Sequence, residues 1–145
     1  MFVKTIIEDK AHGLITVDPT ETIKDVARMF KREQIGFALV QDENKQLVGT
    51  VSERDIIHSL SERADLSDVL VAEVLTINVV TCAIGDTLDT VRDIMTAKRT
   101  RHVLVMDKST LVGIVSIGDL VKHSLNECRV DSIEMVDYIN GQGYH

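Results

Sequence analysis

The chain contains an internal repeat. Residues 15–42 match residues 80–107 at an offset of 65, and from Leu47 onward the offset becomes 64 because one turn is a residue shorter in the second copy. The identical pairs include Leu39/Leu104, Val40/Val105, Gly49/Gly113, Ser52/Ser116 and Asp55/Asp119. Self-similarity at a fixed spacing indicates two copies of one structural unit. Each element that is expected in one copy is therefore expected in the other.

The pattern within each copy predicts the order βαββα. A short β-rich run, 14–17 or 79–82, is followed by a turn and then by apolar residues at helical spacing. Two strands flanking a polar turn come next and predict a hairpin, 37–40 with 46–51 and 103–106 with 111–115. A final helix is expected to begin at Ser52 and at Ser116.

Three further helices are expected outside these units, at Val3 to Lys10, at 71–75 and at 131–140, and residues 141–143 are expected to fray. We divide the chain into repeat 1 (1–62), repeat 2 (63–125) and a C-terminal helix and tail (126–145). A lone βαββα unit leaves one sheet face uncovered. The two repeats of this α+β fold are therefore expected to pack with pseudo-twofold symmetry, which would create two related clefts between them.

Composition argues against several kinds of partner. The net charge of -7 disfavours nucleic acid and anionic membranes, because both bind basic surfaces. No apolar run is long enough to span a membrane, and the N-terminus lacks a signal-peptide pattern, so a cytoplasmic protein is expected. Cys82 and Cys128 are far apart, and the histidines show no ligand spacing on a helix. We therefore predict no metal site.

The strongest local motif is Gly-x-x-Ser-x-x-Asp, which occurs at Gly49–Asp55 and at Gly113–Asp119, where a strand runs into a helix. One interpretation is structural, because Ser-x-x-Asp is close to a helix capping box. The other is a ligand site: the glycine would let a ligand approach the strand, the helix N-terminus would bind an anion, and the carboxylate would accept hydrogen bonds from ribose.

A basic segment, Lys98 to His102, precedes a strand of the second copy and could bind phosphate or be a solvated loop. The apolar residues Ile15, Ile35, Phe37 and Val80 are typical of a core, but they could also form the walls around a base. No nucleophile–base pair, carboxylate dyad or phosphate-binding glycine pattern occurs in the sequence. Catalysis is not expected.

These residues together resemble a tandem pair of CBS domains (the cystathionine β-synthase regulatory repeat), also called a Bateman module, over nearly the whole chain. The resemblance rests on the two Gly-x-x-Ser-x-x-Asp motifs, the Leu-Val-x-Asp and Leu-Val-Gly strands, and the helix starts at Thr22 and Thr87. Ser-Glu-Arg-Asp in the first copy, and Arg-x-Arg-His followed by Ser-Ile-Gly-Asp in the second, resemble a stand-alone bacterial or organellar subgroup. Such modules bind AMP, ADP, ATP, NAD or S-adenosylmethionine between the repeats, form homodimers, and often regulate a partner protein.

The resemblance implies the role of each site residue. In one cleft, Asp119 would bind the ribose hydroxyls, Ser116 and His102 the phosphate with help from Arg101, and Ile15, Ile35, Gly36 and Phe37 the base. In the sister cleft, Asp55 would bind ribose, Ser52 and Arg54 phosphate, and Val80, Thr100 and Arg101 would line the walls. Because Phe37 occupies the position that matches His102, we predict that the Asp119 cleft is occupied more readily.

The leading hypothesis is a non-catalytic regulatory sensor of adenine nucleotides. The alternative is a structural dimerisation module whose clefts are vestigial. An enzyme that acts on nucleotides is disfavoured because the sequence lacks a candidate base. Binding of single-stranded nucleic acid through residues 98–102 is disfavoured by the acidic charge and the low aromatic content.

Overall fold

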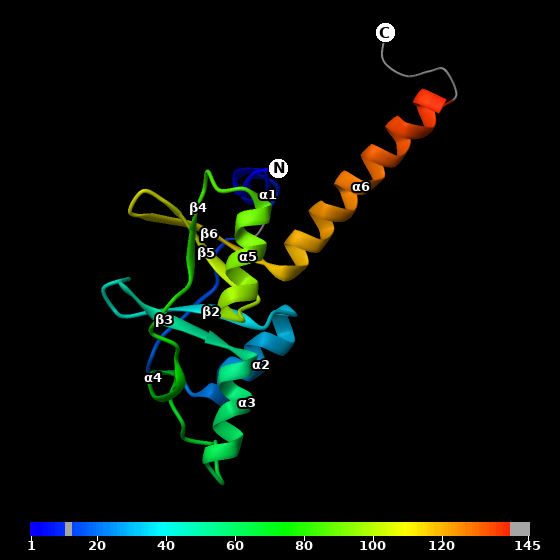
Figure 1. Ribbon diagram of the computed structural model, residues 1–145. Helices are drawn as coiled ribbons and strands as arrows, with labels where there is room; N and C mark the ends of the chain where they lie inside the picture. The colour runs from blue at the N-terminus through cyan, green and yellow to red at the C-terminus, as the bar shows by residue number, and fades with distance from the viewer. Residues whose placement is uncertain (11–12, 140–145) are drawn as a thin grey trace. The chain divides into compact units, whose positions relative to one another are not determined.

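The computed structural model describes residues 1–10 and 13–139 (Figure 1). The chain forms two compact units, His12–Val79 and a second unit made of Met1–Ala11 together with Val80–His145. The segment 141–143, which we expect to fray, lies outside the described residues, as does Asn140 at the end of the predicted tail helix.

The His12–Val79 unit contains one three-stranded sheet. Its strands are β1 (Thr16–Val17), β2 (Phe37–Gln41) and β3 (Leu47–Ser52), in the order β1-β2-β3. β1 and β2 are parallel, and β2 and β3 form the predicted antiparallel hairpin. Its helices are α2 (Ile23–Glu33), α3 (Glu53–Glu62) and α4 (Val71–Val74). The core is aliphatic apart from Phe30, as the low aromatic content requires.

The unit containing Val80–His145 repeats this arrangement. Its strands are β4 (Thr81–Ala83), β5 (His102–Asp107) and β6 (Thr110–Ser116), again with a parallel pair and an antiparallel hairpin. Its helices are α1 (Val3–Asp9), α5 (Leu88–Lys98) and α6 (Ile117–Ile139). The mixed α+β fold with a βαββα order in each copy is thus confirmed.

The repeat extends to the helix ends. Thr22 and Thr87 cap α2 and α5 by accepting a backbone N–H three residues on, which satisfies a donor that the helix leaves unpaired. Both helices end on a left-handed residue, Gln34 at φ 56° and Arg99 at φ 52°. Equivalent sequences therefore give equivalent capping in both units.

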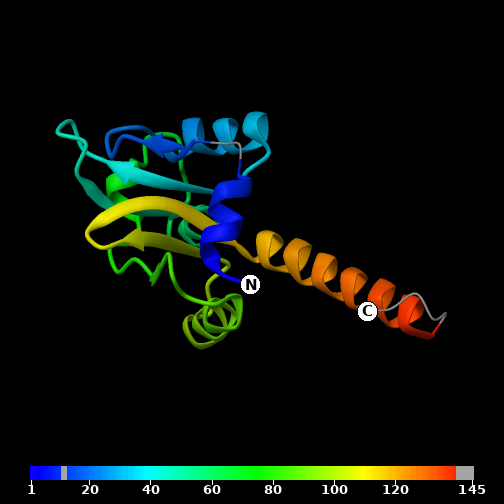
Figure 2. The same cartoon turned by 90° about the horizontal axis from the view of Figure 1, so that it is seen from above.

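The two short leading helices are exchanged between the repeats. α1 comes from the start of the chain but packs on the β4–β6 sheet, where the Val3 N–H donates to the Asp86 carbonyl at 2.9 Å. α4 precedes β4 in the chain but packs with the first sheet, where the Val71 N–H donates to the Glu21 carbonyl at 2.8 Å. Figure 2 shows α1 beside the β5–β6 hairpin. Each unit is therefore completed by a helix that sequence order assigns to the other copy.

Two boundary predictions were wrong. The first strand of each copy starts later than expected, at Thr16 and at Thr81. The carbonyl oxygens of Ile15 and Val80 each still accept one hydrogen bond from the neighbouring strand, but the regular pairing begins one residue later. The separate helix predicted from residue 131 is the end of one continuous helix, α6, that begins at Ile117 (Figure 1). The intervening residues contain neither proline nor glycine beyond Gly118, so nothing interrupts the helix.

Candidate functional site

Ser52 and Asp55 form a capping box at the start of α3. The Asp55 N–H donates to Ser52 Oγ at 3.3 Å, and the Ser52 N–H donates to Asp55 Oδ2 at 2.8 Å. The other carboxylate oxygen, Asp55 Oδ1, accepts a bond from Thr76 Oγ1 at 3.0 Å. Both oxygens of this carboxylate are therefore engaged within the unit, and the capping interpretation of the motif is confirmed here.

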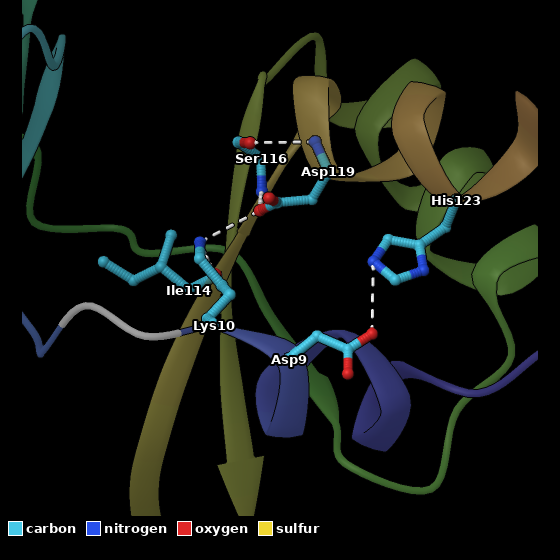
Figure 3. A network of polar contacts seen from close by, with 6 residues as sticks. All are labelled: Asp9, Lys10, Ile114, Ser116, Asp119 and His123. Atoms are coloured by element: carbon cyan, nitrogen blue, oxygen red, sulfur yellow. Dashed lines mark hydrogen bonds and ion pairs between the residues drawn. The ribbon is translucent and has the colours of Figure 1, made fainter. Parts of the chain in front are cut away.

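Ser116 and Asp119 make the equivalent bonds at the start of α6. The Asp119 N–H donates to Ser116 Oγ at 3.1 Å, and the Ser116 N–H donates to Asp119 Oδ2 at 2.9 Å. Here the additional partner is Lys10, which follows α1. Its Nζ donates to Asp119 Oδ2 at 2.9 Å and to the Ile114 carbonyl at 2.8 Å (Figure 3). The additional partner of Asp119 is thus a cation on Oδ2, whereas that of Asp55 is a hydroxyl group on Oδ1.

The end of α1 is held on α6 by a second contact. His123 Nε2 lies 3.9 Å from Asp9 Oδ2, and Asp119 and His123 are one helical turn apart on α6 (Figure 3). The neighbouring residues Asp9 and Lys10 therefore both face the first turns of α6. The contact of Asp9 with α6 thus lies next to that of Lys10 in the chain.

The space beside the two motif glycines is filled by other parts of the same unit. A Cβ on Gly49 would lie 2.4 Å from the Thr76 carbonyl oxygen and 2.5 Å from Leu75 Cδ1. A Cβ on Gly113 would lie 2.5 Å from Ile7 Cδ1. Our interpretation that the missing side chain lets a ligand approach the strand was wrong, because α4 and α1 with their adjoining segments fill that space.

The carboxylate of Asp119 is stabilised in its charged form. Burial alone would raise the pKa of Asp119, but the hydrogen bonds from Ser116 and Lys10 and the charge of Lys10 outweigh burial and lower it. The site therefore holds an ionised carboxylate at neutral pH.

His102 lies in the same unit as this cluster and pairs with Ser116 across the β5–β6 ladder. Burial, and then the charge of Lys10, lower the pKa of His102 to about 4, although Asp119 acts in the opposite direction. At neutral pH the imidazole is uncharged. The basic segment thus carries one cation fewer than the sequence suggested, and His102 could meet a phosphate only as a neutral N–H donor.

This lowered pKa predicts an acid sensitivity. The unfolded chain binds a proton at His102 near pH 6.5 and the folded chain only near pH 4, so folding stability falls as the pH drops between these values. The free energy of unfolding of the wild type should therefore fall when the pH is lowered from 7 to 4.5. In His102→Gln we expect this fall to be smaller by roughly 1–2 kcal/mol, a value reduced for the partial solvent exposure of the side chain.

Urea unfolding at the two pH values measures this difference. His58→Gln, at an exposed position on α3, is the control and should follow the wild type. Identical pH dependence in His102→Gln and the wild type would show that His102 is not the group responsible.

The predicted site residues fall into both units. One group belongs to the unit with α6: Val80, Thr100, Arg101, His102, Ser116 and Asp119. The other belongs to the His12–Val79 unit: Ile15, Ile35, Gly36, Phe37, Ser52, Arg54 and Asp55. Within the first group, His102, Ser116 and Asp119 come together at one end of β5 and β6. Because each predicted cleft combines residues from both units, the clefts stay a prediction.

Sequence reasoning missed two residues at these positions. Lys10 contacts Asp119 although 109 residues separate them, and no pattern in the sequence links the two. Glu53 covers Gly36, where an added Cβ would lie 2.6 Å from Glu53 Cδ. Either side chain would border a ligand bound at the predicted positions.

Within residues 1–10 and 13–139, the structure contains no cluster of three or more metal-ligating side chains. Over the same residues, none of the helices has the combination of length and apolar character that a bilayer crossing requires.

Comparison with known proteins places the chain in a family. A protein-family model of the CBS domain matches residues 6–62 and 71–126. The chain therefore belongs to the CBS-domain family and contains two such domains in tandem. The fold resembles the CBS-domain containing protein ATU1752 from Agrobacterium tumefaciens with a TM-score of 0.80 and 35% identity, over 83% of this chain and 91% of that one.

Two similar solved structures contain adenine compounds. The CBS domain protein PAE2072 from Pyrobaculum aerophilum is complexed with AMP; it is 25% identical, with a TM-score of 0.70, over 82% of this chain and 89% of that one. The CBS domain pair of protein MJ0100 is in complex with 5′-methylthioadenosine and S-adenosyl-L-methionine; it is 25% identical, with a TM-score of 0.74, over 88% of this chain and 98% of that one.

Proposed function

We propose that this chain is a non-catalytic regulatory module that binds an adenine nucleotide between its two CBS domains. The observation that carries the proposal is the geometry at Asp119. Within the part of the chain that the structure describes, Asp119 Oδ1 accepts no hydrogen bond, whereas Oδ2 is fixed by Ser116 and Lys10. An ionised carboxylate with one open oxygen at a helix start suits a ribose hydroxyl, and the adjacent N-terminus of α6 suits a phosphate.

The proposed ligand contacts follow the family resemblance. Asp119 would bind ribose, Ser116, His102 and Arg101 the phosphate, and Ile15, Ile35, Gly36 and Phe37 the base. The sister site would use Ser52, Arg54, Asp55, Val80, Thr100 and Arg101. We rank the Asp119 site first, because both oxygens of Asp55 already have partners. AMP is the leading candidate ligand, and NAD, ADP, ATP and S-adenosylmethionine are the others.

In this proposal the module is a cytoplasmic homodimer whose ligand favours one arrangement of the repeats, which a partner protein then recognises. Exposed apolar side chains on α3 support self-association: Ile57 is 60% exposed and Leu60 is 59% exposed. Ile57 helps to line a groove between α2 and α3. A structural dimerisation module is the alternative function, and the confirmed capping role of Ser52 and Asp55 is compatible with it.

A thermal-shift panel tests the proposal. Nucleotide-free protein is melted with AMP, ADP, ATP, NAD, NADH or S-adenosylmethionine. A ligand at about 100 times its Kd stabilises the folded state by about 2.7 kcal/mol, which corresponds to a Tm rise of roughly 5–10 °C for a protein of this size. Chromatography of the nucleotide after incubation should show it intact. If no ligand moves the Tm, the structural dimerisation module is favoured instead.

A further inference from the structure

The Lys10 ammonium is a built part of the Asp119 site. It donates to two fixed acceptors, Asp119 Oδ2 at 2.9 Å and the Ile114 carbonyl at 2.8 Å. The side chain is 32% exposed and that of Asp119 is 21% exposed, so the pair borders solvent. An ammonium group has three donors. Lys10 makes no third hydrogen bond among the described residues, and it therefore retains a proton for a ligand.

The first unit lacks such a pair. There the partner of the carboxylate is Thr76, whose hydroxyl donates to Asp55 Oδ1 at 3.0 Å. Ile7 contacts Gly113 in the same way as Leu75 contacts Gly49, so these two side chains occupy equivalent places in the two units. Lys10 lies three residues after Ile7, and its counterpart is therefore Asn78, three residues after Leu75. The Asn78 side chain is exposed. Of the two motif aspartates, only Asp119 combines an oxygen that has no hydrogen-bond partner among the described residues with an adjacent ammonium group.

A carboxylate and an ammonium group side by side complement a vicinal diol. Each ribose hydroxyl can both donate and accept, whereas a carboxylate only accepts and an ammonium group only donates. One hydroxyl can therefore donate to Asp119 Oδ1 while its neighbour accepts from Lys10 Nζ. Both bonds would be charge-assisted and hence stronger than neutral ones. With the 2′-hydroxyl on Lys10 and the 3′-hydroxyl on Asp119 Oδ1, a 2′-deoxyribose would lose the bond to Lys10 and keep the bond to Asp119.

We propose that Lys10 is a ligand-binding residue of the Asp119 site, and that the Lys10–Asp119 pair makes this site selective for ribonucleotides over 2′-deoxyribonucleotides. This inference rests on the proposed nucleotide-binding function and adds to it the residue that recognises the sugar. The competing explanation is that Lys10 only anchors the end of α1.

Isothermal titration calorimetry with matched ligands distinguishes the two explanations. The probes are adenosine, which all candidate ligands contain, its 2′-deoxy analogue, and the 5′-monophosphates of both. The wild type should bind the ribo form at least tenfold more tightly. Lys10→Met should weaken ribo binding about tenfold, the size of one charge-assisted hydrogen bond, and deoxy binding less than threefold. Thr76→Val, at the Asp55 carboxylate, should leave the ribo-to-deoxy ratio unchanged.

Other outcomes have distinct meanings. Equal affinity of the wild type for ribo and deoxy forms overturns the inference without any variant, and so does an equal loss of both ligands in Lys10→Met. If Lys10→Met does not fold, Lys10→Arg preserves the charge and a donor and should keep the selectivity; loss of selectivity in a folded Lys10→Arg would count against the inference. If no probe and no candidate nucleotide binds the wild type, the proposed function itself fails.

Discussion

Asp119→Asn is expected to weaken adenine-nucleotide binding by about 30-fold or more, whereas Asp55→Asn weakens it less than threefold. The amide is isosteric with the carboxylate but carries no charge, so it loses the charge-assisted acceptor for ribose and leaves Lys10 without its counter-ion. Asp55 has both oxygens bonded within its own unit and is expected to contribute less to the ligand. Calorimetric titration of both variants with the ligand chosen by the thermal-shift panel measures the contrast.

The pair of variants controls for folding. Asp55 and Asp119 both bond the backbone N–H of the serine that caps their helix, so each substitution disturbs an equivalent cap, at a cost of about 1 kcal/mol. If the two variants lose a similar amount of Tm but only Asp119→Asn loses much affinity, the loss of affinity reflects a contact with the ligand rather than a weaker fold. Equal losses of affinity in the two variants would show that our ranking of the sites is wrong.

Gly49→Ala is expected to destabilise the protein by about 3 kcal/mol, and Gly113→Ala by about 1 kcal/mol. The new Cβ at Gly49 would lie 2.4 Å from the Thr76 carbonyl oxygen, a backbone atom. That carbonyl accepts the Thr50 N–H at 2.9 Å, and the Thr76 N–H donates to the Thr50 carbonyl at 2.8 Å, so relieving the clash breaks this pairing. At Gly113 the clash is with the tip of Ile7, which can change rotamer.

Urea unfolding of the two glycine variants measures this difference. Gly85→Ala is a suitable control, because an added Cβ there meets nothing within 4 Å. If Gly113→Ala proved as destabilising as Gly49→Ala, the Ile7 side chain would be unable to move away from the added Cβ, contrary to our expectation. An equal and small effect of all three substitutions would contradict the close approach of Thr76 to β3.

Local patterns predicted most of the elements. The apolar spacing of 23–30 and 88–95, the polar turns between paired strands and the serines at 52 and 116 all act over a few residues, and the corresponding helices and hairpins are where these signals indicate. The repeat strengthened these predictions, because each element predicted in one copy also had to be compatible with the matching sequence of the other copy. The starts of the first strands, at Thr16 and at Thr81, were predicted less accurately, because the extent of a strand depends on its pairing with a neighbour that is distant in the sequence.

The site was predicted in part. The serine and aspartate of each motif are contiguous in the chain, and their capping geometry follows from the start of a helix. The sequence did not predict that Asp119 and Asp55 have different partners. This difference depends on Lys10 and Thr76, which contact the motifs from distant segments of the chain. The uncharged state of His102 has the same origin, since burial and the charge of Lys10 come from packing.

The sequence by itself determined the two βαββα copies, the caps of their helices and the family to which they belong, because these depend on short-range patterns that the repeat shows twice. Only the tertiary structure decided that each leading helix packs on the sheet of the other copy. That exchange explains the glycines at 49 and 113, and it brings an ammonium group to Asp119 but a hydroxyl group to Asp55. Two motifs that share their glycine, valine, serine and aspartate thus acquire different chemistry, because side chains remote in sequence contact them.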